Sequence, residues 1–187
     1  MKKININNIA SNYLIQVIGN ELRYLVKTEK GWVTKLKTTC NVGKNGFKEN
    51  RKSGDMTTPI GLFKVLYAFG TEYIKTSLKY KAITPYSYFS DDENSDYYNS
   101  WVESEIPING EHLIDYPTEY HYGLVFDFNM SPKVKGNGSS IFLHCIGNHD
   151  YTAGCIAISE MDMVKLLGVL DCETYILIVP NKDYIEM

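Results

Sequence analysis

The residues best suited to chemistry lie in one stretch of the chain, between Ile141 and Ser159. An apolar run ends at His144, a polar loop follows, and Cys155 precedes a second apolar run. The thiolate is the reactive form of cysteine, and a neighbouring imidazole lowers the free-energy cost of forming it. Gly154 suits a tight backbone turn beside the thiol. The stretch therefore predicts Cys155 as a nucleophile and His144 as its general base.

Backbone groups around the thiol complete the predicted site. Attack of a thiol on an amide carbonyl gives a tetrahedral oxyanion and then a thioester, and the base passes the proton to the leaving amine. The N–H of Cys155 and that of Gly154 or Ala153 are the expected oxyanion donors. A third group should orient the imidazole, as in catalytic triads. A backbone carbonyl or the hydroxyl of Ser139 or Ser140 would serve.

The elements that must position these residues are predicted to be mostly strands. Runs rich in β-branched and aromatic residues alternate with Gly, Asn and Pro turns, and the first three runs indicate an antiparallel meander. Pro59 and Gly61 fix a turn before the next strand. The expected strands cover residues 13–18, 22–27, 32–39, 62–70, 120–129, 141–143 and 174–179.

Two helices are expected. Residues 160–170 have apolar side chains at helical spacing, and Ser159 precedes them as an N-cap. Residues 73–80 are expected to form a second, short helix. The expected buried face of the longer helix carries Met161, Val164, Leu167 and Leu170.

Length and charge limit the classes of function. A chain of 187 residues predicts a single domain, 1–187, with a sizeable core. The net charge of −3 gives no argument for binding nucleic acid or an anionic membrane. No stretch approaches transmembrane length, and the N-terminus lacks the continuous apolar segment of a signal peptide. For an extracellular substrate, either a leader was trimmed or export is unconventional; a cytoplasmic protein is the remaining alternative.

The four cysteines do not resemble a dense disulfide scaffold, although two disulfides would be feasible in a secreted protein. Besides Cys155 they are Cys40, Cys145 and Cys172. Cys40 and Cys172 lie in or beside expected strands, so buried free thiols are predicted there.

A zinc site is an alternative interpretation of the same stretch. His144, Cys145, His149 and Cys155 are four good zinc ligands within twelve positions. However, His144 and Cys145 are adjacent, so on a strand they point to opposite faces. The spacing also matches no common zinc finger. The cysteine-nucleophile interpretation is therefore preferred.

Several motifs together resemble the catalytic domain of L,D-transpeptidases, the YkuD family. They are the strand His followed by a small residue, Gly and Cys (residues 144–155), the upstream Gly-Asp and Thr-Pro-x-Gly (54–61) and the Tyr-x-Tyr strand (120–122). The resemblance covers about residues 13–180. It implies a mainly β fold: an antiparallel β-sandwich of the L,D-transpeptidase catalytic-domain type with a few short helices.

The resemblance also implies a reaction. The family cleaves peptidoglycan stem peptides before a terminal D-residue and passes the acyl group to an amine (transpeptidation) or to water (carboxypeptidation), without a cofactor or metal. Carbapenem-type β-lactams are the expected covalent inhibitors. Tyr98, Tyr120, Tyr122 and Thr152 are the expected substrate-binding residues.

The sequence departs from the family pattern at two positions. Many members have a second His where this chain has Ala153, and many have an Arg where it has Ala157. The structural or carboxylate-binding role of that Arg is therefore unfilled. These departures leave the Cys–His pair intact but put the substrate preference in question. A non-catalytic cell-wall binding module of the same fold is the alternative they raise.

Overall fold

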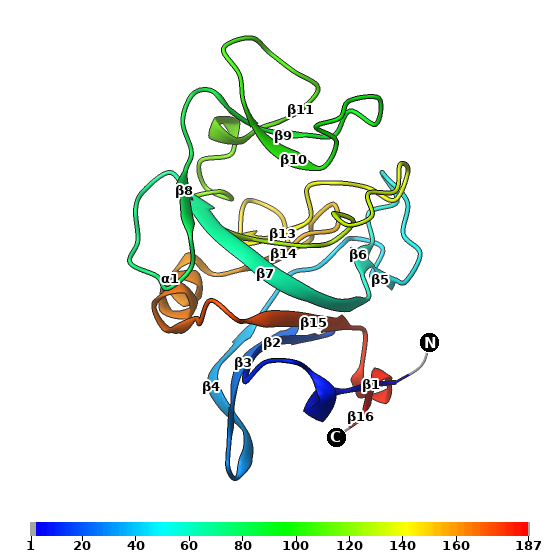
Figure 1. Ribbon diagram of the computed structural model, residues 1–187, viewed down its shortest axis with the longest axis vertical. Coiled ribbons are helices and arrows are strands. Elements are labelled where there is room, and N and C mark those ends of the chain that lie inside the picture. The colour runs from blue at the N-terminus through cyan, green and yellow to red at the C-terminus, as the bar shows by residue number, and fades with distance from the viewer. Residues whose placement is uncertain (1–2, 187) are drawn as a thin grey trace.

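A mixed nine-stranded sheet forms the body of the protein (Figure 1), as seen in a computed structural model that describes residues 3–186. Its strand order is β14-β13-β12-β7-β15-β2-β3-β4, and β8 pairs with β7. The strands are β2 (Tyr13–Ile18), β3 (Glu21–Thr28), β4 (Gly31–Thr39), β7 (Gly61–Gly70), β8 (Tyr80–Ala82), β12 (Tyr122–Phe126), β13 (Phe142–Cys145), β14 (Ile156–Ile158) and β15 (Tyr175–Val179).

A second, three-stranded sheet lies above this body in Figure 1 and is called the cap here. It consists of β9 (Ser87–Ser90), β10 (Ser100–Glu103) and β11 (Gly110–His112), followed by the short 3₁₀ helix η2 (Leu113–Asp115). Smaller elements are β1 (Ile4–Asn5) with β16 (Ile185–Glu186), β5 (Phe47–Lys48) with β6 (Thr58–Pro59), η1 (Ile6–Asn8) and η3 (Lys182–Tyr184).

The expected meander is confirmed as β2, β3 and β4, paired antiparallel in sequence order. Burial follows position in the sheet: β2 is central and buried through its middle, whereas the edge strand β4 is largely exposed. The apolar run of β15 lies between β7, antiparallel, and β2, parallel. A strand enclosed on both faces needs such a continuous apolar sequence rather than an alternating one.

Two apolar clusters on opposite faces of the sheet make the fold a sandwich. One joins both halves of the sheet to the helix α1 (Glu160–Val169), with Ile15, Leu124, Leu143 and Ile178 among its buried members. The other joins the cap to the outer face of β7, β12 and β13. The predicted mainly β sandwich is thus confirmed.

The helix after the candidate site is confirmed, and its predicted inward face is right at Leu167 and Leu170 but wrong at Met161 and Val164. Ser159 is the N-cap: its Oγ accepts from the N–H of Asp162 at 3.2 Å. Met163, Leu166 and Leu167 are buried, whereas Met161 is 66% exposed and Val164 38%. Both sets have helical spacing, and contact with β12 and β13 selects the set that turns inward.

Two further expectations are not met. Residues 73–80 form no helix; they run irregularly into β8, because Tyr80 pairs with Ala68 at the edge of β7. Cys172 is exposed rather than buried, because it lies in the turn between α1 and β15. No helix among residues 3–186 is both long enough and apolar enough to span a bilayer.

Candidate active site

Adjacent parallel strands bring His144 and Cys155 together. Leu143 of β13 pairs with Ile156 of β14, so Cys155 is level with Phe142. Side chains two positions apart on a strand share a face. His144 therefore lies one such step beyond Phe142, on the face that carries the thiol. The Sγ of Cys155 accepts a hydrogen bond from the Phe142 N–H at 3.3 Å, which fixes this alignment.

The imidazole of His144 is held by the main chain. Its Nδ1 lies 2.7 Å from the carbonyl oxygen of Cys145, and because a carbonyl can only accept, Nδ1 must carry the proton. In the neutral ring, Nε2 is then free to take a proton. Of the orienting groups expected from the sequence, the structure selects a backbone carbonyl rather than Ser139 or Ser140.

The thiol of Cys155 lies in a polar notch between strands. Its Sγ–H donates to the carbonyl of Ser140 at 3.3 Å. Ser140 has a φ of 53°, in the left-handed region, and its N–H donates to the buried side chain of Asn99 at 3.2 Å. Asn99 also donates to the carbonyls of Phe128 and Asn129, at 3.0 and 2.9 Å. Asn99 thus fixes the loop whose Ser140 carbonyl accepts the hydrogen bond from the thiol.

Burial keeps both partners neutral at rest. The thiol is 9% exposed, and burial together with the Glu111 carboxylate raises the pKa of Cys155 to about 12. The Phe142 N–H and the Arg51 guanidinium oppose that rise. His144 is 7% exposed, and its burial lowers the pKa of the imidazole. The resting pair is a thiol and a neutral imidazole rather than an ion pair.

Two threonines fix the backbone at Cys155. The hydroxyls of Thr152 and Thr58 both donate to its carbonyl oxygen, at 2.6 and 3.4 Å. Thr58 belongs to the Thr-Pro-x-Gly motif, which explains why that turn accompanies the Gly-Cys segment. The Gly154 N–H already donates to the hydroxyl of Thr152 at 3.1 Å. Of the expected oxyanion donors, the N–H groups of Cys155 and Ala153 are the ones that this network leaves open.

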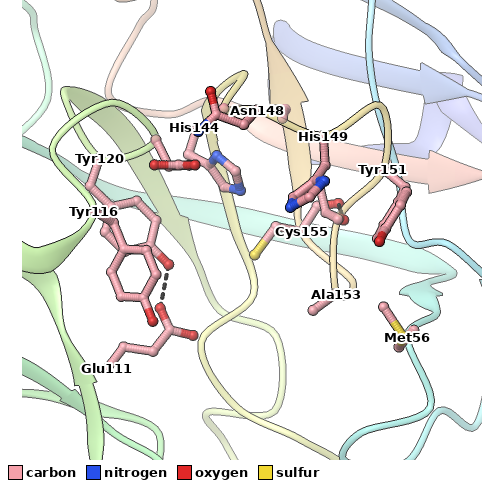
Figure 2. A pocket seen from close by; sticks show the side chains of 14 residues that line it. Met56, Glu111, Tyr116, Tyr120, His144, Asn148, His149, Tyr151, Ala153 and Cys155 are labelled. Carbon is pink, nitrogen blue, oxygen red and sulfur yellow. Dashed lines mark hydrogen bonds between the residues drawn. The ribbon is translucent and has the colours of Figure 1, made fainter.

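Figure 2 shows the imidazole and the thiol directed into one cavity, called the imidazole cavity here. Its volume is about 370 Å³. Across it, the hydroxyl of Tyr120 donates to the carboxylate of Glu111, and the ring of Tyr120 meets His144 edge-on. Burial raises the pKa of Glu111 to about 7, although the Tyr120 hydrogen bond works against that rise. The cap supplies Glu111 and the strands supply His144, so the cavity lies between the two sheets.

A second cavity of 210 Å³ adjoins Cys155 and is called the guanidinium cavity here. It is lined by Arg51, Gly138 and Ser140, and it shares Met56, Glu111, Ala153 and Cys155 with the imidazole cavity. The Arg51 side chain is only 4% exposed. Burial lowers its pKa, while the nearby Asp55 opposes that change.

The predicted substrate-binding residues divide into two groups. Tyr120 and Thr152 line the imidazole cavity. Tyr122 does not: the expected strand begins at Tyr122 rather than Tyr120, and the Tyr122 side chain packs in the core shared with α1. Tyr98 is buried and lines neither cavity; its burial raises the pKa of its hydroxyl, and the charge of Arg51 opposes that rise.

The four residues of the zinc alternative are separated by the strand geometry. The Sγ of Cys145 faces the main core and donates to the carbonyl of Tyr122 at 3.4 Å, on the face of β13 opposite His144. His149 stacks on Tyr151 at the cavity rim. No group of three or more metal-ligating side chains is found among residues 3–186.

Sequence reasoning missed the charged groups of the site. Arg51 lies in a basic, glycine-rich segment, and Glu111 in an irregular acidic and polar region. Both segments have the composition of solvated loops. The Gly-Asp dipeptide just after Arg51 was the one available signal, since Asp55 anchors the loop that carries the guanidinium.

A sequence model of the L,D-transpeptidase catalytic domain (YkuD) matches residues 12–178. The chain belongs to this family. Within the family pattern, Ala157 stands where many members have Arg; it is buried, and its backbone pairs with Asn41. The family turn around Cys155 is therefore built here without a cation beside it in sequence.

Two solved structures resemble the YkuD domain described here. Bd1075 from Bdellovibrio bacteriovorus is 16% identical with a TM-score of 0.52, covering 97% of this chain and 52% of that one. The helical cell shape determining protein Pgp2 from Campylobacter jejuni is 12% identical with a TM-score of 0.54, covering 90% and 48%. The chain spans about half the length of these structures, and at such identities the likeness shows the fold alone. No curated protein gave a sequence match.

Proposed function

We propose that this protein is a cysteine acyltransferase acting on peptidoglycan stem peptides, cleaving before a terminal D-residue. Membership of the L,D-transpeptidase family supports the substrate class. The observation that carries the proposal is the pairing of a buried thiol with an imidazole in one cavity. The imidazole is held in the tautomer whose free nitrogen can accept a proton.

The reaction begins from the neutral pair. The Sγ of Cys155 bonds to the scissile carbonyl carbon while its proton moves to Nε2 of His144. The carbonyl oxygen becomes an oxyanion and accepts from the N–H groups of Cys155 and Ala153. The carbon–nitrogen bond then breaks, His144 returns the proton to the leaving amine, and a thioester remains on Cys155.

An amine of a second stem peptide or a water molecule then attacks the thioester. His144 takes the proton from the attacking group, and the Cys155 thiol is regenerated with either a new amide or a free acid as product. Because burial and the Glu111 carboxylate raise the pKa of the resting thiol, we propose that attack is concerted with proton transfer to His144.

The muropeptide assay is the direct test. Purified protein is incubated with disaccharide stem peptides of three, four and five residues, and the products are read by mass spectrometry. We expect loss of one residue from the four-residue stem, with cross-linked product where transfer to an amine prevails. Cys155→Ala should abolish this, while Cys172→Ala, which removes an exposed thiol, should leave it unchanged. Turnover by Cys155→Ala at the wild-type rate would overturn the assignment.

A binding module of the same fold is the second candidate. The departures at Ala153 and Ala157 and the high pKa of the Cys155 thiol favour it. A carbapenem separates the two: a stoichiometric adduct at Cys155, found by intact-mass measurement, supports the acyltransferase. No adduct, together with retained binding to purified sacculi, supports the module.

The substrate class sets where the protein must work. Stem peptides lie in the cell wall, so the working protein must reach that compartment. Fractionation of the native host with an antibody against this domain should find it with the envelope. Recovery in the cytosol alone would contradict this location.

A further inference from the structure

The strongest unexplained feature of the site is the buried cation of Arg51. Its Nε lies 3.8 Å from a carboxylate oxygen of Asp55, and its guanidinium lies over the ring of Phe128 at 5.7 Å. Neither Nε nor Nη1 has a hydrogen-bond partner, although both atoms are buried. A guanidinium stays charged in proteins, so this arrangement leaves a buried charge with open donors.

Asp55 does not supply the missing partner. Its carboxylate already accepts from the N–H and hydroxyl of Thr57, at 3.0 and 2.6 Å, and from the N–H of Lys52 at 2.8 Å. Lys48 adds an ion pair at 3.3 Å. Although burial works against it, these hydrogen bonds hold the pKa of Asp55 well below its usual range. Asp55 anchors the loop, and Arg51 keeps hydrogen-bond donors without a partner beside Cys155.

The guanidinium cavity has the other features of an anion site. The hydroxyl of Ser140, on the same wall, is also buried without a partner. Gly138 has a φ of 93°, and a Cβ there would lie 2.2 Å from Nη1 of Arg51. The glycine thus makes room for the guanidinium. Asp91 and Glu111 line the same cavity, so a bound anion must sit close to Arg51 and Ser140 to avoid them.

We propose that the guanidinium cavity is a carboxylate subsite, in which Arg51 and Ser140 bind a carboxylate of the peptide that acylates Cys155. A carboxylate can accept two parallel N–H bonds from one guanidinium, and both Arg51 and Ser140 line this cavity. The proposal rests on the proposed function, because that function supplies a peptide at Cys155. It also assigns the cation that the family pattern places two residues after the Cys to a residue about a hundred positions upstream, since Ala157 stands there.

Two carboxylates of a stem peptide could reach this cavity: the terminal α-carboxylate and the side-chain carboxylate of the third residue. Two ligand changes distinguish them. A C-terminal carboxamide removes the first, and lysine in place of diaminopimelate at position three removes the second. Binding is measured on Cys155→Ala by isothermal titration calorimetry, so no turnover is needed and Arg51 is unaltered.

We expect one of the two changes to weaken binding about tenfold or more, the effect typical of losing a charge-assisted hydrogen bond. In Cys155→Ala/Arg51→Gln, the unmodified peptide and the peptide that lacks the recognised carboxylate should bind equally. In Cys155→Ala/Arg51→Lys, part of the preference for the unmodified peptide should remain. Lys52→Gln is the matched control: it removes a charge from the same loop, where the ammonium donates to the Asn137 side chain at 3.0 Å. The Cys155→Ala/Lys52→Gln protein should keep the full preference for the unmodified peptide.

Equal binding of all three peptides to Cys155→Ala would overturn the subsite, as would a preference that survives in a folded Arg51→Gln protein. Thermal unfolding of each variant establishes that it is folded. The two proposals fail differently. If the protein shows no turnover but has a carboxylate preference that depends on Arg51, only the acyltransferase proposal is contradicted. Turnover without that preference sinks the subsite alone.

Discussion

The two cavities that meet at Cys155 differ in how their polar groups are paired. In the imidazole cavity, His144 is bonded to a main-chain carbonyl and Tyr120 to Glu111. In the guanidinium cavity, donors of Arg51 and the hydroxyl of Ser140 have no partner. A paired group is already oriented for proton transfer, whereas an unpaired buried group gains most when a ligand arrives. The imidazole cavity is therefore suited to catalysis, and the guanidinium cavity is suited to recognition of a ligand.

The largest expected effect is on the chemical side. His144→Ala should lower kcat/KM for the four-residue stem by about 10²–10⁴-fold, because the thiol proton then has no nearby acceptor. Steady-state assays of D-alanine release measure this. His121→Ala is the control, because its ring contacts Glu160 outside both cavities. A His144→Ala protein with near wild-type kcat/KM would contradict the assignment of catalysis to the imidazole cavity.

The loop that carries Ser140 is expected to depend on Asn99. Asn99→Gly keeps the positive φ of 52° accessible but removes the three hydrogen bonds of a buried side chain. The free energy of unfolding should fall by about 2 kcal/mol, as for loss of a buried hydrogen-bonded side chain. Urea denaturation measures it. Asn109→Gly, in an exposed loop of the cap, should change the free energy of unfolding little. Equal losses in the two variants would show that the hydrogen bonds of Asn99 do not stabilise the fold.

Glu111, which lines both cavities, should make stability depend on pH. Its pKa is about 7 in the folded protein and near 4.5 when unfolded, so the folded state holds the proton longer. Stability therefore falls as pH rises from about 4.5 to 7. Urea midpoints of the wild type and Glu111→Gln should converge at pH 4 and separate at pH 7.5, with the variant more stable. A constant difference across this range would contradict the shift.

The smallest effect expected is on thiol reactivity. The Glu111 carboxylate raises the pKa of Cys155, so Glu111→Gln should increase the thiolate fraction severalfold at pH 8.5. Iodoacetamide alkylation followed by mass spectrometry gives the rate. Glu173→Gln, at an exposed turn, is the control. A slower rate in Glu111→Gln would show that the carboxylate promotes ionisation instead.

Local sequence patterns predicted the strands, the N-cap at Ser159 and the pairing of His144 with Cys155. Each of these depends on neighbours along a short segment, where alternation and spacing act directly. The expected inward face of α1 was right at Leu167 and Leu170 but wrong at Met161 and Val164, because apolar residues at helical spacing also lie on the neighbouring face. The strand expected from Tyr120 begins two residues later, at Tyr122.

The charges of the site could not be found this way. Arg51 and Glu111 reach Cys155 only through the folded sheets, from 104 and 44 positions away in the sequence. Nothing in a basic or an acidic loop marks which side chain turns inward. Burial and the absence of a partner, which identify Arg51, are properties of the folded chain alone.

The position of β15 has a consequence for how the chain comes to be folded during synthesis. Residues 175–179 lie between β7 and β2, so the meander of β2, β3 and β4 joins the rest of the main sheet only through the strand of that sheet that is synthesised last. Until the ribosome releases that segment, β2 and β7 both expose edges that can pair with other chains. A nascent chain stalled before residue 175 would therefore carry a nearly complete set of site residues and no closed sheet to hold them.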